Sequence, residues 1–348
     1  MAADMQDMKQ LIAKVVGGGV LSTQEAETAF DIIMSGDATP SQMGGFLTAL
    51  RMRGEAVSEI TGAARTMRAK AKRISAPADA MDIVGTGGDK LGTYNVSTAT
   101  ALVVAASGVP VAKHGNRAAS SKSGTADALS QLGVDLDCPF ANIEKSIIEA
   151  GLGFMIAPRH HGAMRNVMPT RMELSIPTIF NILGPLSNPA MVKRYLIGCF
   201  RSEFIEKMAE TLGDLGAERA WVVHGHSGMD EISTTGPTQV ASLEDGKVTT
   251  FEISPADAGL PEAALEDLLG GTPEQNAAAI TELLNGAQSP YRDIVLFNAA
   301  AALLIAGKAE TLAMGVSLAA DSIDSGRAKK VLADLVRVTN DYPKEAEA

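Results

Sequence analysis

The sequence predicts an α/β protein with a small N-terminal helical domain and a large domain built on a mostly parallel central sheet. Residues 1–73 carry apolar residues at helical spacing and few β-branched ones. From MDIVG at residue 81 onward, short apolar strands alternate with helical segments, a pattern typical of a parallel sheet covered by helices. We therefore expect a helical domain at 1–73, joined by a segment near 170–190, and an α/β domain at 74–348.

The helical domain is expected to hold four helices, because each has its own start or stop signal. The second opens on Ser22 with Glu25 three residues later, a capping box. The third has Pro40 at its first position, where proline costs no hydrogen bond. The four are expected at 8–16 (MKQLIAKVV, ending at the glycines 17–19), from Ser22, from Thr39-Pro40 to Gly54, and from Ser58 to Lys72.

The large domain is expected to alternate strands and helices before it returns to helix. Expected strands are Met81–Val84, Val109–Lys113, Gly153–Ile156, Tyr195–Cys199 and Ala220–Val223. Expected helices are Val96–Ala106, Thr125–Leu132, Ile143–Ala150 and Glu203–Leu215. Residues 232–253 look like antiparallel strands with turns, and VLFNAAAALLI in the tail reads as a buried helix.

The composition excludes several classes of protein. Apolar residues make up 46% of the chain and the net charge is −11, which opposes the basic face that nucleic-acid binding needs. Two isolated cysteines, Cys138 and Cys199, form neither a disulfide framework nor a zinc spacing and read as core residues. The N-terminus lacks the pattern of a signal peptide, and the longest apolar stretches are shorter than a membrane span. We expect a cytoplasmic protein that binds neither nucleic acid nor membrane.

Polar loops follow four of the expected strands. They read GTGGD, KHGNRAASSKSG, APRHHGAMRN and HGHSGMDEIS. Since ligands of open parallel sheets bind outside the carboxyl ends of the strands, these loops are expected to converge on one site.

The GTGGD loop predicts an anion site. Its glycines let successive backbone N–H groups curl around an anion, and the next helix, opening near Asn95, adds its N-terminal dipole and the hydroxyls of Ser97 and Thr98. The loop matches neither the GxGxxG nor the Walker pattern. The alternative is an ordinary tight turn between strand and helix.

The loop KHGNRAASSKSG is rich in hydrogen-bond donors and suits a polyanion. The alternative is a solvated basic loop. For His114 alone, a structural hydrogen bond is favoured over proton transfer.

The adjacent carboxylates Asp230 and Glu231 suit Mg²⁺, which takes one or two carboxylates together with substrate phosphates. A solvated acidic turn is the alternative, but the position of the loop favours metal. Asp89 within GTGGD is expected to anchor the loop through backbone N–H groups or to hold a metal-bound water; capping of the next helix stays open.

Between the third strand and Pro177, one or two of Arg159, His160, His161, Arg165 and Arg171 are expected to bind an anion. The stretch IFNILGPLSNP that follows reads as a hinge or linker, because Gly-Pro and Asn-Pro steps mark turns.

These motifs, in this order, resemble the anthranilate phosphoribosyltransferases: GTGGD, NVST, KHGNRAASSKSG, RMELSIPTIFNILGPLSNP and GMDEIS. The resemblance covers nearly the whole chain. It implies transfer of the 5-phosphoribosyl group of phosphoribosyl pyrophosphate to the amino group of anthranilate, in tryptophan biosynthesis. It also implies a nucleoside phosphorylase-like phosphoribosyltransferase fold, a homodimer formed through the N-terminal helices, and two Mg²⁺ ions per site.

The resemblance assigns residues to each ligand. Around the phosphoribosyl donor it places Gly85, Thr86, Gly87, Gly88, Asp89, Thr93, Asn95, Ser97, Thr98, Lys113, Ser121, Lys122 and Ser123. The anthranilate side takes Gly85, His114, Asn116 and Arg171, and the metal takes Ser97, Asp230 and Glu231. No general base is assigned.

Two other functions compete with this interpretation. A nucleoside phosphorylase of the same fold would use inorganic phosphate and a pyrimidine, but it has less need of the paired carboxylates. A non-catalytic relative that binds nucleic acid would show a basic stripe, which the net charge of −11 opposes. The apolar residues of the first helices, among them Leu11, Ile12, Leu47, Leu50 and Met52, exceed what four helices would bury alone, which favours the homodimer.

Overall fold

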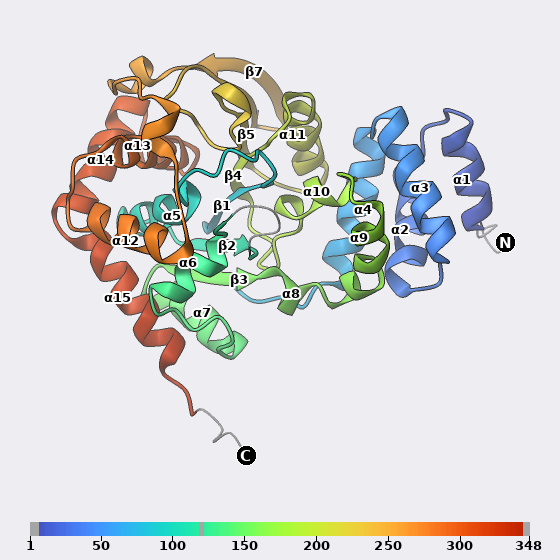
Figure 1. The fold of residues 1–348 in the computed structure, drawn as a ribbon, viewed down its shortest axis with the longest axis horizontal. Coiled ribbons are helices and arrows are strands. Elements are labelled where there is room, and N and C mark those ends of the chain that lie inside the picture. The colour runs from blue at the N-terminus through green and yellow to red at the C-terminus, as the bar shows by residue number, and fades with distance from the viewer. Residues whose placement is uncertain (1–6, 118–121, 344–348) are drawn as a thin grey trace.

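The computed structural model describes residues 7–117 and 122–343. Figure 1 shows a helical domain on one side of the molecule and a larger α/β domain on the other, as the sequence predicts. The helices are α1 Met8–Val16, α2 Thr23–Ser35, α3 Pro40–Arg53, α4 Val57–Lys70, α5 Val96–Ala106, α6 Thr125–Gln131, α7 Phe140–Glu149, α8 Ala157–His160, α9 Met168–Leu174, α10 Phe180–Leu183, α11 Ile205–Asp214, α12 Pro273–Leu284, α13 Pro290–Ile305, α14 Leu312–Asp324 and α15 Arg327–Asn340.

The helix starts predicted from end signals are confirmed. Ser22 and Glu25 form the capping box of α2, and Thr39 caps α3 with Pro40 in its first turn. The sequence analysis missed a third capping box, in which Asp7 and Gln10 open α1.

The central sheet has seven strands in the order β3-β2-β1-β4-β5-β6-β7. They are β1 Met81–Gly85, β2 Val111–Gly115, β3 Leu152–Ile156, β4 Arg194–Gly198, β5 Arg219–His224, β6 Thr238–Glu244 and β7 Lys247–Ile253. The neighbours from β3 to β5 are parallel, and β6 and β7 add an antiparallel edge, as predicted. Strand β1 has β2 on one side and β4 on the other, so the direction in which the sheet grows reverses at β1. A ligand crevice is expected at the carboxyl ends of the strands where such a reversal occurs.

The helical domain shares one apolar core with a face of the sheet. The cluster that contains the buried side chains of α1–α4 continues into Tyr195 and Ile197 of β4 and into helix α11. Leu11, Leu47 and Leu50 are fully buried inside this protomer. The expectation that these three side chains favour a dimer is therefore wrong, because the sheet and α11 complete the core that four helices alone could not.

The segment from β3 to β4 runs back to the helical domain. Helix α9 packs against α3, and the Asn166 side chain donates to the carbonyl of Met34 at 2.8 Å. Phe180 of α10 meets the ring of Phe30 edge-on, with 5.7 Å between centroids. IFNILGPLSNP, which was expected to be a hinge or linker, is packed into the shared core, with Leu186 and its neighbours buried.

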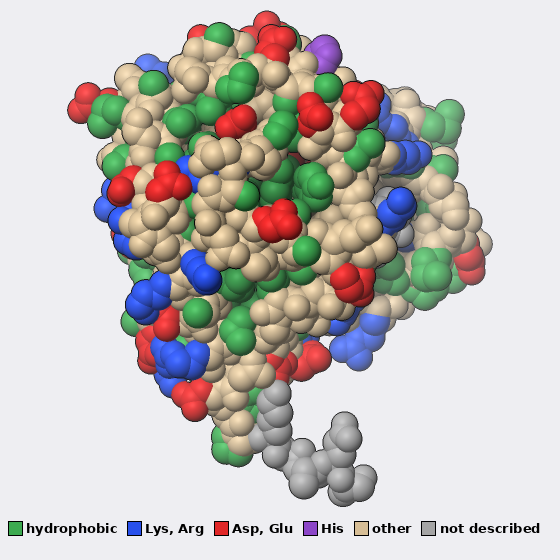
Figure 2. All heavy atoms as spheres, turned by 60° about the vertical axis from the view of Figure 1, so that its left-hand side comes forward, with side chains coloured by type: hydrophobic (Ala, Val, Ile, Leu, Met, Phe, Trp, Pro, Cys, Tyr) green, Lys and Arg blue, Asp and Glu red, His purple; other side chains and the backbone are tan. Residues whose placement is uncertain are grey.

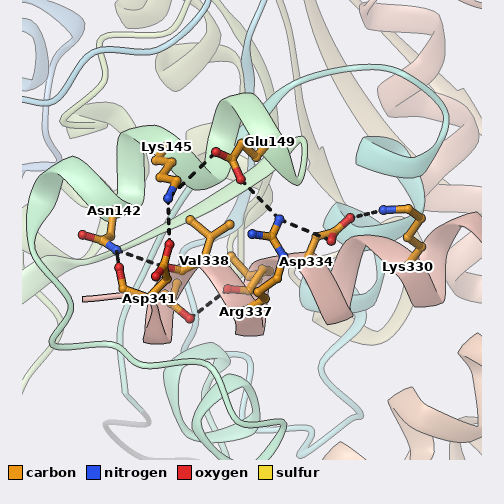
Figure 3. A network of polar contacts seen from close by, with 10 residues as sticks. Asn142, Lys145, Glu149, Lys330, Asp334, Arg337, Val338 and Asp341 are labelled. Carbon is orange, nitrogen blue, oxygen red and sulfur yellow. Dashed lines mark hydrogen bonds and ion pairs between the residues drawn. The ribbon is translucent and has the colours of Figure 1, made fainter. Parts of the chain in front are cut away.

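The C-terminal helix α15 is joined to α7 by a polar seam at the far end of the α/β domain (Figure 3). Lys145 pairs with Asp341 at 2.8 Å, and Arg337 pairs with Glu149 at 3.2 Å. Beside the Lys145–Asp341 pair, on the side away from Glu149, the buried amide of Asn142 donates to the carbonyls of Val338 and Asp341 at 2.9 and 3.0 Å. These contacts attach α15 and Asp341 to helix α7 of the α/β domain.

The surface agrees with the acidic composition. On the face shown in Figure 2, Asp and Glu side chains are scattered among Lys and Arg, and no continuous basic stripe is visible on that face. Within the described ranges, no helix is long and apolar enough to span a membrane.

Candidate functional site

A cavity of about 390 Å³ opens at the carboxyl ends of β1 and β2. It gathers the loops that the sequence predicts to converge and adds the helical side through α9 and α10. The predicted site residues that line it are Gly85, Thr86, Gly87, Gly88, Asp89, Thr93, Asn95, Ser97, Lys113, His114, Asn116, Ser123, Arg171, Asp230 and Glu231.

Two of the predicted residues that the structure describes, Thr98 and Lys122, do not line the cavity. Thr98 lies one position beyond Ser97 on α5 and is 1% exposed, turned into the core. Lys122 is exposed outside the cavity, and Ser121 lies outside the described residues.

The glycine loop turns on backbone conformations that favour glycine. Gly87 and Gly88 have φ of +68° and +89°. The N–H of Gly87 donates to Asp230 Oδ2 at 2.6 Å. A Cβ at Gly85 would lie 2.3 Å from that same oxygen, and one at Gly198 would lie 1.6 Å from the Asp230 carbonyl. The two strand-end glycines thus let the loop of Asp230 close over β1 and β4; the sequence analysis missed Gly198.

Three carboxylates crowd this corner. Burial raises the pKa of Asp230 well above its usual value, and the neighbouring Asp89 and Glu231 carboxylates raise it further. Burial also raises the pKa of Glu231 to about 7, although the Lys113 ammonium and the backbone N–H of Ser97 act the other way. That N–H donates to Glu231 Oε1 at 3.2 Å. Crowded, half-buried carboxylates of this kind are stabilised when a cation joins them.

Asp89 anchors the glycine loop. Its Oδ1 accepts from the backbone N–H of Leu91 at 3.2 Å. It does not cap the following helix, because α5 begins at Val96 with Asn95 as its N-cap. The loop-anchoring hydrogen bond expected for Asp89 is therefore present, and its holding of a metal-bound water stays a prediction.

Lys113 is the buried cation of the site. Its side chain is 1% exposed, and its ammonium donates to the carbonyl of Ile83. Burial lowers the pKa of Lys113, while the nearby carboxylates of Asp82, Glu231 and Asp230 raise it. The ammonium is therefore held inside the protein, among the carboxylates of the site.

Asn95 organises the N-terminus of α5. Its side-chain oxygen accepts from Ser123 Oγ at 3.2 Å and from Asn276 Nδ2 at 2.9 Å, and its carbonyl accepts from the Tyr291 hydroxyl at 3.2 Å. Asn276 and Tyr291 come from the C-terminal helices and carry no sequence signal near the other motifs, so the sequence analysis missed them.

His114 is held as a neutral side chain. Its Nδ1 lies 3.2 Å from the carbonyl of Gly184, and its ring centroid is 5.1 Å from that of His161. Burial lowers the pKa of His114 well below its usual value, and His161 adds to the effect; burial also lowers the pKa of His161 to about 4. This geometry agrees with the structural hydrogen bond favoured from the sequence.

Arg171 is the cation on the other side of the cavity. Its guanidinium lies 3.4 Å from Asn181 Oδ1 and 3.8 Å from Met168 Sδ, with its carbon 5.6 Å from the ring centroid of Phe180. Burial lowers its pKa. Among the described residues no carboxylate pairs with this guanidinium, so it can meet an anionic group in the cavity. Phe180 and Asn181 were missed because IFNILGP was interpreted as linker.

The other basic residues after β3 point elsewhere. Arg159 donates to the carbonyls of Leu136 and Cys138 at 2.8 and 2.7 Å, and neither Arg159 nor Arg165 lines the cavity. Asn116 lies at the rim, where its side-chain oxygen accepts from the N–H of Arg117 at 2.8 Å.

The donor atoms of this site suit a cation that brings further ligands. No three His, Cys, Asp or Glu side chains converge as a ready-made metal site in the described part of the chain. Asp230 and Glu231 instead offer two carboxylates beside a loop built for an anion, which is the arrangement in which Mg²⁺ is shared with phosphate oxygens and water.

Comparisons with known proteins agree with this geometry. A model described as the glycosyl transferase family, a/b domain, matches residues 77–329, and its helical bundle counterpart matches residues 9–71. An anthranilate phosphoribosyltransferase of Rhodospirillum rubrum is 63% identical over 95% of this chain and 96% of its own length.

Solved structures give the same result. The anthranilate phosphoribosyltransferase of Thermus thermophilus superposes with a TM-score of 0.90 at 44% identity, over 94% of this chain and 99% of that one. The enzyme of Saccharomyces cerevisiae in complex with PRPP and Mg superposes with a TM-score of 0.88 at 28% identity, over 98% and 100%. The same yeast enzyme in complex with 4-fluoroanthranilate gives 0.86 at 27% identity, over 98% and 100%. With both domains matched and relatives similar over nearly its whole length, the chain belongs to the anthranilate phosphoribosyltransferase family.

Proposed function

We propose that the cavity at the ends of β1 and β2 carries the reaction of this family. The 5-phosphoribosyl group of phosphoribosyl pyrophosphate (PRPP) passes to the amino group of anthranilate, giving N-(5-phosphoribosyl)anthranilate and pyrophosphate in tryptophan biosynthesis. The observation that carries the proposal is the crowding of Asp89, Asp230 and Glu231 against a glycine loop shaped for an anion. Carboxylates and phosphates share a site when a metal ion lies between them.

The donor is proposed to lie over the glycine loop and the start of α5. Gly87 and Gly88 leave space for backbone N–H groups to approach phosphate oxygens, and Lys113 supplies a fixed positive charge from below. Asn95 and Ser123 form the far wall. The yeast relative was solved in complex with PRPP and Mg, which supports PRPP as the donor.

Mg²⁺ is the proposed cofactor, with two ions per site. Asp230 and Glu231 would hold it, with Ser97 close to Glu231. When bound, Mg²⁺ supplies positive charge to the pyrophosphate as it leaves.

Anthranilate is proposed to lie between His114, Asn116, Gly85 and Arg171. Its amino group is uncharged and attacks without prior deprotonation, so the protein chiefly has to position it. Neutral His114 avoids placing a second positive charge beside the amine, while Arg171 faces the carboxylate. Catalysis then rests on placement and electrostatics rather than on a general base.

The test is consumption of anthranilate, followed by its fluorescence, with PRPP and Mg²⁺. Turnover that needs both PRPP and Mg²⁺ is the expected result. Phosphorolysis of a pyrimidine nucleoside without Mg²⁺, and no consumption of anthranilate, would instead identify a nucleoside phosphorylase.

Gly87→Ala is expected to weaken donor binding about tenfold and leave anthranilate binding within about twofold. A Cβ at Gly87 meets no atom within 4 Å, but at φ +68° it costs about 1–2 kcal/mol and blocks approach to the phosphates. Calorimetric titration of each ligand measures the effect. Gly18→Ala is the matched control, with φ +82° and no neighbour within 4 Å. Equal losses for both ligands would indicate collapse of the loop instead.

We also propose a homodimer formed through the helical domain. The proposal is supported by apolar side chains that this domain leaves exposed. Met52 on α3 is 84% exposed, and Met172 on the adjacent α9 is 71% exposed. Val16 and Val20 near α1 are 68% and 51% exposed. Exposed apolar groups at this density on one domain indicate an interface.

Sedimentation at micromolar concentration is expected to show a dimer that Met52→Glu combined with Met172→Glu converts to a monomer, because burying two carboxylates is costly. Met314→Glu, at a 46% exposed site on α14, is the control and should stay dimeric. A wild-type protein that sediments only as monomer would exclude this assembly.

The helical domain is proposed to span 1–73 with the segment near 170–190, which packs against it through α9, and the α/β domain 74–348. The reaction is placed in the cytoplasm, with small molecules rather than nucleic acid as partners.

A further inference from the structure

The backbone ladder between β1 and β2 is interrupted. Their outer neighbours are in continuous register: β1 with β4 from Met81 to Gly85, and β2 with β3 from Val111 to Gly115. Between β1 and β2 themselves, which the structure describes throughout, the register holds at Met81 and Val111 alone. Beyond that pair no backbone ladder joins the two strands, and the cavity lies at their carboxyl ends.

Side chains take the place of the missing backbone partners. Asp82 of β1 accepts from the backbone N–H of His114 in β2, with 3.0 Å between N and Oδ1. Lys113 of β2 donates from its ammonium to the carbonyl of Ile83 in β1. Each strand thus satisfies a backbone group of the other through a charged side chain lying in the gap.

Asn188 closes the same gap from outside the sheet. Its Nδ2 donates to Asp82 Oδ2 at 2.7 Å and to the carbonyl of Ala112 at 2.9 Å. Its own Oδ1 accepts from the N–H of Ala190 at 2.8 Å, which fixes the orientation of the amide. All the hydrogen-bonding groups of this side chain are therefore committed to holding Asp82 and β2 in place.

Stability alone does not explain this arrangement. Asp82 and Asn188 are 0% exposed and Lys113 is 1% exposed. Buried charges lose so much hydration that well-packed apolar residues usually stabilise a fold as well or better. A regular β ladder would also have satisfied the same backbone groups. What the opened ladder provides is a place for one ammonium inside the sheet, beside the carboxylates of Asp230 and Glu231.

We propose that Asp82 and Asn188 are positioning residues of the donor site, which keep β1 and β2 apart and fix the Lys113 ammonium in the gap beneath the pyrophosphate. The inference rests on the proposed function, because it takes the donor to lie over the glycine loop. Neither residue touches the cavity: Asp82 and Asn188 act through Lys113, which lines it.

The test is a double-variant cycle on donor binding. PRPP with Mg²⁺ is titrated by calorimetry into wild type, Asn188→Ala, Lys113→Ala and the combination of the two. Loss of a charge-assisted contact corresponds to about a tenfold weaker affinity for each single variant. If Asn188 acts through Lys113, the combined variant binds within about twofold of Lys113→Ala alone. Effects that multiply would overturn the proposal.

Asn142→Ala is the matched structural control. Asn142 is also a buried amide that donates to two carbonyls, but in the seam between α7 and α15 (Figure 3). The Asn142→Ala variant is expected to lower the melting temperature, as Asn188→Ala does, but to leave donor affinity unchanged. If Asn188→Ala lowers the melting temperature and leaves donor affinity unchanged, Asp82 and Asn188 have a structural role alone and the proposal fails.

Asp82→Asn gives the same comparison should Asn188→Ala not fold. Its volume is kept and its Oδ1 can still accept from the N–H of His114. Its new amide nitrogen cannot accept from Asn188 Nδ2, so the variant loses both the contact with Asn188 and the charge beside Lys113. The KM for PRPP should rise about tenfold with the KM for anthranilate within about twofold. Equal rises in both constants would contradict the inference. A wild-type protein that binds no donor would instead overturn the proposed function.

Discussion

Asp230→Asn combined with Glu231→Gln is expected to lower kcat/KM at least about a thousandfold in a protein that still folds. A metal that neutralises a leaving pyrophosphate contributes several kcal/mol, and each 1.36 kcal/mol is tenfold in rate. Both amides keep the volume of the carboxylates and can still accept from the N–H groups of Gly87 and Ser97. Initial rates of anthranilate consumption over a range of Mg²⁺ concentrations measure the loss.

The same double variant, which lowers activity, should raise the stability of the ligand-free enzyme near neutral pH. Since burial raises the pKa of Glu231 to about 7 from an ordinary 4.5, the folded enzyme holds a proton that the unfolded chain has released. The free energy of unfolding of the ligand-free enzyme therefore falls as pH rises from about 4.5 to about 7. Asp230, with its pKa also raised, adds to this fall. Thermal unfolding between pH 5 and 8, about this range, should show a flatter profile for the amide variant.

Ligand-induced stabilisation separates lost metal binding from a damaged fold. PRPP with Mg²⁺ should raise the melting temperature of wild type and leave that of the double variant unchanged, because only binding to the folded state stabilises it. Glu252→Gln with Glu262→Gln, two exposed acids far along the chain, is the charge-matched control and should behave as wild type. Near-normal, Mg²⁺-dependent activity in the double variant would refute the assignment of Asp230 and Glu231.

Local signals account for what the sequence could predict. The helix starts at Ser22 and Pro40 depend on residues no more than three positions apart, so they can be located without knowing the fold. The convergence of GTGGD with the loop of Asp230 follows from one rule about where parallel strands end. Both features were predicted because neither needs the order of strands in the sheet.

Features that depend on strand neighbours could not be predicted. The sequence assigns no role to Asp82 within the apolar strand MDIVG, yet its carboxylate accepts from the backbone N–H of His114 in β2. Asn276 and Tyr291 reach Asn95 from helices almost two hundred positions away in the chain, and only the fold brings them there.

Thr98 is a different case, since a helical rule would have excluded it. Neighbouring positions on a helix do not face the same way. Once Ser97 is placed toward the cavity, Thr98 must turn into the core, where it is 1% exposed.

Arg171→Ala is expected to raise the KM for anthranilate at least about tenfold and to change the KM for PRPP little. The carboxylate is the charged group of anthranilate, and a planar guanidinium can bind both of its oxygens. Charge-assisted hydrogen bonds of this kind contribute roughly 1.5–3 kcal/mol each, and about 1.4 kcal/mol is a factor of ten. Among the described residues the guanidinium has a long contact to Asn181, a sulfur contact to Met168 and a contact with the Phe180 ring, so its removal breaks no ion pair there.

Two further variants sharpen this prediction. Arg171→Lys keeps the charge but not the planar fork, and should fall between wild type and Arg171→Ala. Arg165→Ala removes an exposed arginine of the same segment that does not line the cavity, and should leave both constants unchanged. Because Arg171 and Asp230 line different walls of one cavity, a large rise in the KM for PRPP with none for anthranilate would mean that Arg171 serves the donor, and that anthranilate enters from another side.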